Sequence, residues 1–430
     1  MAKLKFQTPT GMHDILPEDQ AYLRHILKVA ESISTFYGFQ RVDTPILEEA
    51  ELFEKGTGVS TDIVEKQMYT LKTRGGDILA LRPEFTPGMV RSFLQHGMHN
   101  LPQPVKLYTS GPLFRYERPQ EGRYRQLHQF DLEVFGDQSA AIDAQLIQIF
   151  VAILKELKLP GVVVKVNSIG DSQCRPYYKK ALISYLRNKQ YAVCADCRRR
   201  LKTNPLRVLD CKEEKCQQVR SQAPQMIDYL CQECKDHFKS LLEFFDEADL
   251  PYHLDPYLVR GLDYYTKTVF EVFANLTPEN AEGVGLALGG GGRYDGLVKL
   301  YGDRETPAVG FGMGIDRVLS AVKRQGVIRP SSPSPKVFLA QLGEAAKKKS
   351  MKLFEDLRKA NIPVSESLGR DSLRAQLSRA DKLGVPYTLI MGQREVLDNS
   401  VVIRTMGSGA QKTVKLQDTV EEVKKLLKGE

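Results

Sequence analysis

The chain has 430 residues, of which 42% are hydrophobic and 27% are charged, and its formal net charge is +8. This length predicts two or three domains, and this composition excludes a disordered or fibrous chain. No apolar run approaches the ~20 residues of a membrane-spanning helix, and no signal peptide is visible, so we expect a cytoplasmic protein without a membrane partner.

Positive charge gathers near the end of the chain. Residues 331–430 hold 18 Lys and Arg against 12 Asp and Glu, a net charge of +6, while the preceding 330 residues carry +2. A basic module beside a near-neutral body is typical of contact with a polyanion such as RNA. A solvated basic surface that aids solubility would give the same charge.

The first hundred residues predict two helices with short strands between them. One helix is expected at 17–39, where apolar side chains share a face, and another within 82–98, where Pro87 suits a first turn. Strands are expected at 39–53, 63–73 and 76–82.

Strand signals then dominate, with helices expected at about 138–157 and 176–188. The strands are expected at 106–117, 128–136, 162–170, 257–273 and 287–298. Runs of strands with few helices between them indicate a mainly antiparallel sheet, and thus an α+β domain.

Two segments interrupt this pattern. Residues 172–250 are helical, polar and Cys-rich, which indicates an insertion, and RPSSPSPK is a Pro/Ser linker after which strands and helices alternate. We therefore expect four parts: a first domain over 1–171 and 251–328, the insertion over 172–250, the linker over 329–336, and an α/β domain over 337–430.

Six of the seven cysteines lie between Cys194 and Cys234. Cys194-x₂-Cys197 and Cys231-x₂-Cys234 have the spacing of zinc ligands, with Cys211 and Cys216 between them. Disulfides are not expected in a reducing cytosol. The cysteines therefore predict either structural zinc or a set of reduced thiols.

The stretch GPLFRYERPQEGRYRQLHQFDLEVFG, residues 111–136, predicts a hairpin with one polar face. Because side chains alternate along a strand, Arg115 and Glu117 share a face of the first strand, as Gln129, Asp131 and Glu133 do on the second. The opposite, core-facing side would hold Phe114, Tyr116, Phe130 and Val134. The polar face would either meet water or form the floor of a site.

Three other segments favour a site. RPEFT places Glu84 and Thr86 at a helix start, and LVRGLDYY places Arg260 with two tyrosines at a turn. GGGGRYDGL and VGFGMGIDR supply glycines, which let a backbone approach a ligand, followed by Arg317. Arginines from three places suit several phosphates, and no P-loop or dinucleotide fingerprint is present. The residues alone predict an enzyme that binds a polyphosphate and a small polar molecule.

These motifs resemble those of histidyl-tRNA synthetases, which are class II aminoacyl-tRNA synthetases, over essentially the whole chain. TPTGMHDILPED is similar to the opening of the family, while LVRGLDYYTKTVFE and GGGGRYDGLV are similar to two signatures of histidyl enzymes. Three further stretches are similar to class II motifs 1, 2 and 3, in that order: FQRVDTPILE, FRYERPQEGRYRQLHQFDLEVFG and AVGFGMGIDRV.

The resemblance implies a class II synthetase-type antiparallel sheet flanked by helices, with a helical insertion near the tRNA acceptor stem and a C-terminal α/β anticodon-binding domain. It implies that L-histidine and ATP, with Mg²⁺, form histidyl-adenylate, and that histidine then passes to the 3′ end of tRNA(His). It also implies a homodimer with the strand of Pro45 at the interface, and an insertion that commonly folds without metal.

The resemblance also implies a role for each candidate residue. Arg115 and Arg260 would contact the α-phosphate, Arg260 in a role that magnesium plays in other class II enzymes. Glu117 would lie at the adenine side and Arg317 at the γ-phosphate. The histidine-binding residues would be Glu84, Phe85, Thr86, Gln129, Glu133, Tyr264 and Tyr265.

The chain departs from the family pattern at two places. It has RPEFTP where relatives often have RPEGTA, and Leu127 stands where motif 2 often has an aromatic residue that stacks on adenine. The alternative function is that of a non-catalytic, histidine-sensing regulatory paralogue of histidine biosynthesis. Such relatives usually lack the C-terminal domain and the catalytic arginines, which this chain keeps.

Overall fold

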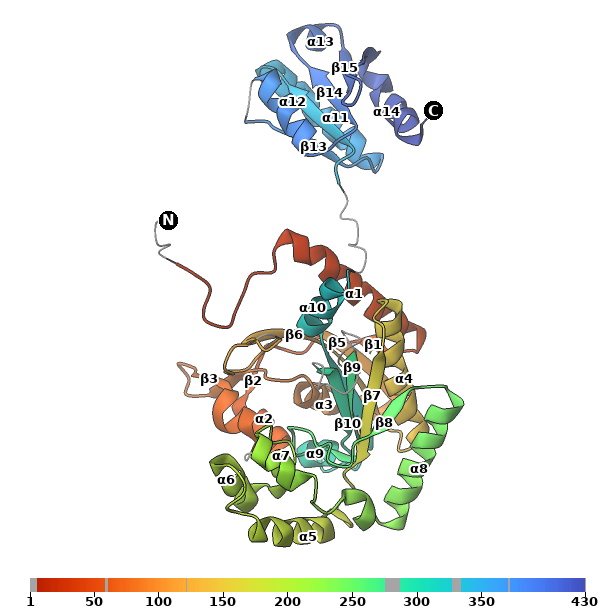
Figure 1. The fold of residues 1–430 in the computed structure, drawn as a ribbon. Coiled ribbons are helices and arrows are strands. Elements are labelled where there is room, and N and C mark those ends of the chain that lie inside the picture. Colours follow the sequence, from red (N-terminus) through yellow and green to blue (C-terminus); the bar gives the residue numbers. More distant parts are fainter. Residues whose placement is uncertain are drawn as a thin grey trace. The chain divides into compact units, whose positions relative to one another are not determined.

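The computed structural model describes residues 6–58, 61–120, 122–274, 287–326, 334–369 and 372–429. It divides into two compact units, Met1–Arg329 and Pro330–Glu430 (Figure 1). The expected linker 329–336 lies outside the described residues up to Pro333. Among the described residues, no helix is both long and apolar enough to cross a membrane.

An eight-stranded sheet forms the centre of unit 1. Its strands, in spatial order, are β1 (Gln40–Arg41), β5 (Val105–Phe114), β6 (Gln126–Phe135), β11 (Ala308–Gly314), β10 (Ala287–Arg293), β9 (Thr266–Ala274), β7 (Val162–Ser168) and β8 (Tyr252–Leu254). The edge pairs β1–β5 and β7–β8 are parallel, and every other neighbouring pair is antiparallel. The predicted α+β class with a mainly antiparallel sheet is confirmed.

One face of the sheet packs on helices. These helices are α1 (Pro17–Phe36), α4 (Ala140–Glu156), α8 (Gln232–Glu247) and α10 (Ile315–Arg324). Phe130, Leu132 and Val134 of β6 are fully buried in this core, and Phe150 of α4 stacks on Phe311 at 4.6 Å between ring centroids. Since side chains alternate along β6, its acidic residues face the opposite side of the sheet.

The opposite side carries smaller elements. These are a three-stranded sheet of β2 (Leu47–Glu49), β4 (Ile78–Leu81) and β3 (Tyr69–Lys72), the helices α2 (Ala50–Thr57), α3 (Thr86–Gln95) and α9 (Leu297–Gly302), the π-helical turn Ile63–Gln67 and the 3₁₀ turn Met98–Asn100. Some of these differ from the predicted strands. Ala50, Phe53 and Thr57 are buried at helical spacing, so the last four residues of the strand expected at 39–53 belong to a helix instead.

Other predicted strands are shorter than expected. The 63–73 strand begins only at Tyr69, because residues 63–67 form the helical turn. The 287–298 strand ends at Arg293, before α9. The β5 strand ends at Phe114, which leaves Tyr116 outside the sheet and 53% exposed. The prediction that Tyr116 faces the core is therefore wrong; its ring lies against Tyr69 and beneath the Arg125 guanidinium group.

The segment expected as an insertion is helical. It contains α5 (Arg175–Asn188), α6 (Ala195–Thr203), α7 (Glu214–Arg220), α8 and the 3₁₀ turns Pro205–Val208 and Met226–Tyr229. Figure 1 shows α5, α6 and α7 gathered at one end of unit 1, close to α2 and α9. Helix α8 differs from them, because its Phe238, Leu241 and Phe245 belong to the core beneath the sheet.

Unit 2 is a separate α/β domain. Its sheet has the order β13 (Val364–Glu366), β12 (Val337–Gln341), β14 (Tyr387–Met391), β15 (Ser400–Thr405) and β16 (Gln411–Lys415). Its helices are α11 (Glu344–Lys359), α12 (Leu373–Lys382), α13 (Gln393–Leu397) and α14 (Thr419–Lys428), with a 3₁₀ turn at Leu416–Asp418. The sequence did not predict β16, whose side chains are almost all exposed and thus lack an apolar alternation.

Candidate active site

A cleft in three connected parts lies on the sheet face that carries Gln129 and Asp131. The inner cavity is lined by residues that include Glu84, Thr86, Gln129, Asp131, Arg260, Tyr264, Tyr265 and Tyr294. The middle cavity is lined by residues that include Arg115, Glu117, Arg123, Tyr124, Leu127, Arg260, Glu271 and Arg317. The outer cavity lies between this face and the insertion. Arg115 lines all three, so the cavities adjoin.

Two buried carboxylates in and beneath the inner cavity are each held by one threonine and one tyrosine. Glu84 accepts hydrogen bonds from the hydroxyls of Thr57 and Tyr264, both at 2.6 Å. Glu133 accepts from Thr86 at 2.6 Å and from Tyr294. Paired hydroxyl donors fix the position of each carboxylate while leaving lone pairs for a ligand.

The acids of this region hold their protons more tightly than usual. Burial, followed by the charge of Glu84, raises the pKa of Glu133 to about 8. Burial and the neighbouring charges of Glu133 and Glu84 raise the pKa of Asp131 well above its ordinary value. The Oδ1 atom of Asp131 is buried without a hydrogen-bond partner. A ligand with N–H groups or positive charge would satisfy these oxygens.

Arginines dominate the middle cavity. Arg115 Nε donates to the Pro83 carbonyl at 2.8 Å, and Arg317 donates to the carbonyls of Gly122 and Ala287 at 3.0 and 2.8 Å. Backbone carbonyls thus orient both guanidinium groups without neutralising them. Arg260 differs, because its Nη1 forms an ion pair with Glu271 at 2.5 Å.

The positive charges of these arginines repel one another. Burial, and then the charges of Arg123 and Arg115, lower the pKa of Arg317. The Nε atom of Arg260 is also buried without a hydrogen-bond partner. An anion in the middle cavity would relieve both conditions, and guanidinium groups converging from several elements suit a polyphosphate.

The glycines of β10 and β11 leave space for the side chains of Glu133 and Arg260. A Cβ atom at Gly310 would lie 1.6 Å from Glu133 Oε2, and one at Gly290 would lie 2.8 Å from Arg260 Nη1. The sequence predicted that these glycines let the backbone approach a ligand. Both Gly290 and Gly310 line the inner cavity, and they also leave room for these two side chains.

Most of the predicted site residues gather in the cleft, and two lie behind it. Glu133 is beneath the inner cavity, where it reaches the lining through Thr86 and Tyr294. Phe85 is fully buried in the core under the Arg82 guanidinium group and does not line a part of the cleft. The remaining predicted residues line at least one cavity: Arg115, Arg260, Glu84, Thr86, Gln129, Tyr264, Tyr265, Glu117 and Arg317.

The sequence missed several residues of the cleft. Thr57, which donates to Glu84, lies in α2 beyond the strand expected at 39–53, and Glu271 lies deep within a predicted strand, so no local signal marked either one. Tyr294 could have been found, because it follows the glycine run and Arg293 in GGGGRYDGL.

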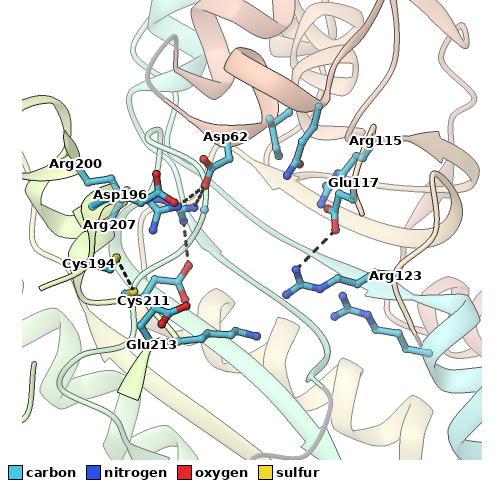
Figure 2. Close-up of a pocket in the computed structure, with 17 residues that line it drawn as sticks. Asp62, Arg115, Glu117, Arg123, Cys194, Asp196, Arg200, Arg207, Cys211 and Glu213 are labelled. Carbon is cyan, nitrogen blue, oxygen red and sulfur yellow. Dashed lines mark hydrogen bonds and ion pairs between the residues drawn. The ribbon is translucent and has the colours of Figure 1, made fainter. Parts of the chain in front are cut away.

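The outer cavity has a second wall built by the insertion. In Figure 2, Arg200 and Arg207 lie across the cavity from Arg115, Glu117 and Arg123. Both insertion arginines contact Asp62 Oδ2, at 2.8 and 3.1 Å. This wall is therefore tied to the main body of unit 1 close to the arginine-lined middle cavity.

An antiparallel sheet with a charged hairpin, an arginine after a glycine-rich strand and a separate α/β domain define a class II aminoacyl-tRNA synthetase. The family model described as histidyl-tRNA synthetase matches residues 11–318, and the anticodon binding domain matches residues 336–426. The chain belongs to the histidyl-tRNA synthetase family.

Individual relatives agree with this assignment. The chain is 45% identical to a histidine–tRNA ligase of Dehalococcoides mccartyi, over 98% of this chain and 99% of that relative. It is 41% identical to one of Thermodesulfovibrio yellowstonii, over 98% and 99% of the two chains. The apo histidyl-tRNA synthetase of S. aureus has a TM-score of 0.80 and 33% identity, covering 97% of this chain and all of that one.

These relatives match the catalytic unit and unit 2 together. The chain is an aminoacyl-tRNA ligase that attaches histidine to its tRNA with ATP.

Proposed function

We propose that the three parts of the cleft divide the histidine–tRNA ligase reaction among them. The inner cavity holds L-histidine, the middle cavity holds ATP, and the outer cavity receives the 3′ end of tRNA(His). The observation that carries this proposal is the convergence of Arg115, Arg260 and Arg317 on a cavity directly beside a tyrosine- and carboxylate-lined one.

Histidine would be recognised through its imidazole and its α-substituents. Neutral imidazole has one donor and one acceptor nitrogen, which the Tyr265 hydroxyl can match together with Glu133, acting through the Thr86 and Tyr294 hydroxyls that donate to it. Glu84 would accept from the α-ammonium group, with Thr86 and Gln129 beside it. A wrong amino acid would leave these buried groups unpaired, and such sites reject analogues by ~10⁴-fold or more.

Adenylate formation would depend on charge placed in advance. A carboxylate oxygen of histidine attacks the α-phosphorus of ATP, and the bond to pyrophosphate breaks. Arg115 and Arg260 would stabilise the negative charge that grows on the α-phosphate, while Arg317 binds the γ-phosphate. Glu117 would lie at the adenine side, where Leu127 offers an apolar surface to the ring.

ATP would enter with Mg²⁺, and the donor set of the middle cavity fits this ion. Glu117 and Glu271 both line the cavity beside the arginines. One or two carboxylates together with phosphate oxygens form the usual Mg²⁺ site, so Glu271 would hold the ion while Glu117 serves the adenine side. The bound ion would neutralise phosphate charge.

In the second step, the terminal ribose hydroxyl of tRNA(His) attacks the carbonyl carbon of the adenylate and AMP leaves. Arg123, Arg200 and Arg207 line the outer cavity and would contact the phosphates of the acceptor end. Unit 2, which carries most of the net positive charge, would bind the anticodon.

The chain would act in the cytoplasm as a homodimer. Ile46, Leu47 and Ile78 are exposed on the three-stranded sheet next to Pro45, where the motif 1 resemblance expects the interface. Sedimentation equilibrium tests this proposal, and a monomer at micromolar concentration contradicts it.

Exchange of labelled pyrophosphate into ATP tests the proposed division of the cleft. The purified chain is expected to catalyse exchange with L-histidine and not with other amino acids. The proposal is abandoned if the protein binds histidine or tRNA(His) without supporting exchange.

A further inference from the structure

All seven cysteines belong to two separate clusters in unit 1, outside the inner and middle cavities. The first cluster consists of Cys194, Cys197, Cys211 and Cys216. The second cluster consists of Asp171, Cys174, Cys231 and Cys234. In each one, the four sulfur or carboxylate oxygen atoms lie within 4.8 Å of one another. The two C-x₂-C pairs, which look alike in the sequence, therefore belong to different clusters.

The spacing within each cluster fits a tetrahedral ion. Zinc bound by thiolates at about 2.3 Å places neighbouring sulfurs about 3.8 Å apart. The Sγ atoms of Cys194 and Cys211 are 3.8 Å apart, as are those of Cys174 and Cys234. Disulfide sulfurs would lie about 2.05 Å apart, so neither pair is a disulfide.

Asp171 has one oxygen engaged in a turn and the other directed at the second cluster. Its Oδ1 atom accepts the backbone N–H groups of Gln173 and Cys174 at 2.9 and 3.2 Å, which is an Asx turn before α5. Its Oδ2 atom lies 3.9 Å from Cys231 Sγ. The Oδ1 atom also lies 3.4 Å from Cys174 Sγ, so both oxygens of this carboxylate border the sulfurs of the second cluster.

The surroundings of both clusters suit bound thiolates. The Cys194 N–H points at Cys216 Sγ over 3.2 Å, and the Asp171 N–H points at Cys174 Sγ over 3.3 Å. Four anionic ligands around Zn²⁺ leave a charge of about −2, which such amide donors stabilise.

We propose that the chain binds two structural zinc ions: one in the first cluster, held by four thiolates, and one in the second, held by three thiolates and the Asp171 carboxylate. Thiolate ligands in tetrahedral geometry select zinc over hard cations such as Mg²⁺ and Ca²⁺. Neither site keeps an open position for chemistry, as expected of structural zinc.

The first zinc would fasten the insertion wall of the outer cavity. Between its ligands Cys197 and Cys211, the chain runs through Asn204 and Arg207. Asn204 donates to Asp263 at 2.6 Å, and Arg207 pairs with Asp62. Cys194 and Cys211 themselves line the cavity (Figure 2).

The second zinc would fasten the base of the histidine pocket. Arg175, the neighbour of Cys174, donates to the carbonyl of Tyr265 at 2.6 Å and to that of Gly170 at 2.9 Å. The ligands come from both sides of the insertion, because Asp171 follows β7 while Cys231 and Cys234 lie at the start of α8. This ion would thus hold together the two segments between which the helices α5, α6 and α7 of the insertion lie.

Metal analysis of the full-length native chain tests the proposal. Protein purified under reducing conditions, without added zinc and without chelator, is expected to carry two equivalents of zinc per chain. Less than half an equivalent of zinc per chain, or iron in its place, would overturn the proposal.

Paired variants test whether the two sites are independent. Cys211→Ser and Cys231→Ser are each expected to lose one equivalent, so each variant serves as the control for the other. Asp171→Asn keeps the turn oxygen but removes one anionic ligand, and it is expected to release one zinc faster to a chelator. Loss of both ions, or of none, from a variant with a native circular dichroism spectrum contradicts two separate sites.

Discussion

The Tyr264 hydroxyl donates a 2.6 Å hydrogen bond to Glu84 Oε2, joining two residues that lie 180 positions apart in the chain. The resemblance to the family placed Tyr264 among the histidine-binding residues, and in the structure it orients the carboxylate proposed for the α-ammonium group. The tyrosine proposed for the imidazole is its neighbour Tyr265, and the two rings lie 4.7 Å apart.

Replacing Tyr264 by phenylalanine is expected to weaken histidine binding. Glu84 would lose one of its two hydroxyl donors, and a hydrogen bond to a charged group is worth about 1.5–3 kcal/mol. The KM for histidine in pyrophosphate exchange should rise by about 10-fold or more. Tyr185→Phe, which removes a tyrosine hydroxyl bonded to Val219 in the insertion, is the matched control and should leave this KM unchanged. An unaltered KM in Tyr264→Phe contradicts the role of Tyr264.

Arg260→Ala is expected to lower the rate of adenylate formation by ~10²-fold or more, the usual scale for removing one group that stabilises transition-state charge. The loss should appear in kcat, because the charge grows on the α-phosphate only as the reaction proceeds. Single-turnover formation of histidyl-adenylate measures it. Arg358→Ala, in unit 2 and outside the cleft, is the control. Near-normal turnover would refute the assignment.

Gly310→Ala is expected to abolish histidine binding, with folding of the variant checked by circular dichroism. The added methyl would lie 1.6 Å from Glu133 Oε2 and force that carboxylate out of position. Gly296→Ala is the matched control, because a Cβ atom there meets open space. Isothermal titration with histidine should separate the two variants, and equal affinities would show that Glu133 tolerates displacement.

Glu133 is expected to make the stability of the ligand-free protein depend on pH. Burial raises its pKa from 4.5 to about 8 in the folded chain. The folded state therefore binds the extra proton between these values, and stability is lost as the pH rises from about 4.5 toward 8. Glu133→Gln should escape this loss, which amounts to a few kcal/mol because one pKa unit corresponds to about 1.4 kcal/mol.

Thermal unfolding midpoints at pH 5.5 and pH 8 provide the measurement. The midpoint of Glu133→Gln should rise relative to that of the native chain between the two pH values. A constant difference would mean that the folded-state pKa of Glu133 is not raised.

The amphipathic β6 strand, the paired motifs and the change of rhythm after the Pro/Ser segment were enough to predict the α+β class and the family. The alternation of apolar and polar residues and the glycines that mark turns are local patterns, so they can be read from a single sequence. Short elements were predicted less well. Residues 50–57 and 63–67 carry no strong local signal of a helix. Their conformations depend on the parts of the chain against which they pack.

The sequence by itself determined most of the residues that form the cleft, because motif 2, the LVRGLDYY segment and the glycine-rich strands carry them. Only the tertiary structure decided their partners. Long-range contacts paired Glu84 with Tyr264 and Glu133 with Tyr294, and they separated two identical C-x₂-C spacings into two clusters. Spacing along a chain constrains only residues that are a few positions apart. The site is completed by side chains from distant segments, which meet only when the chain folds.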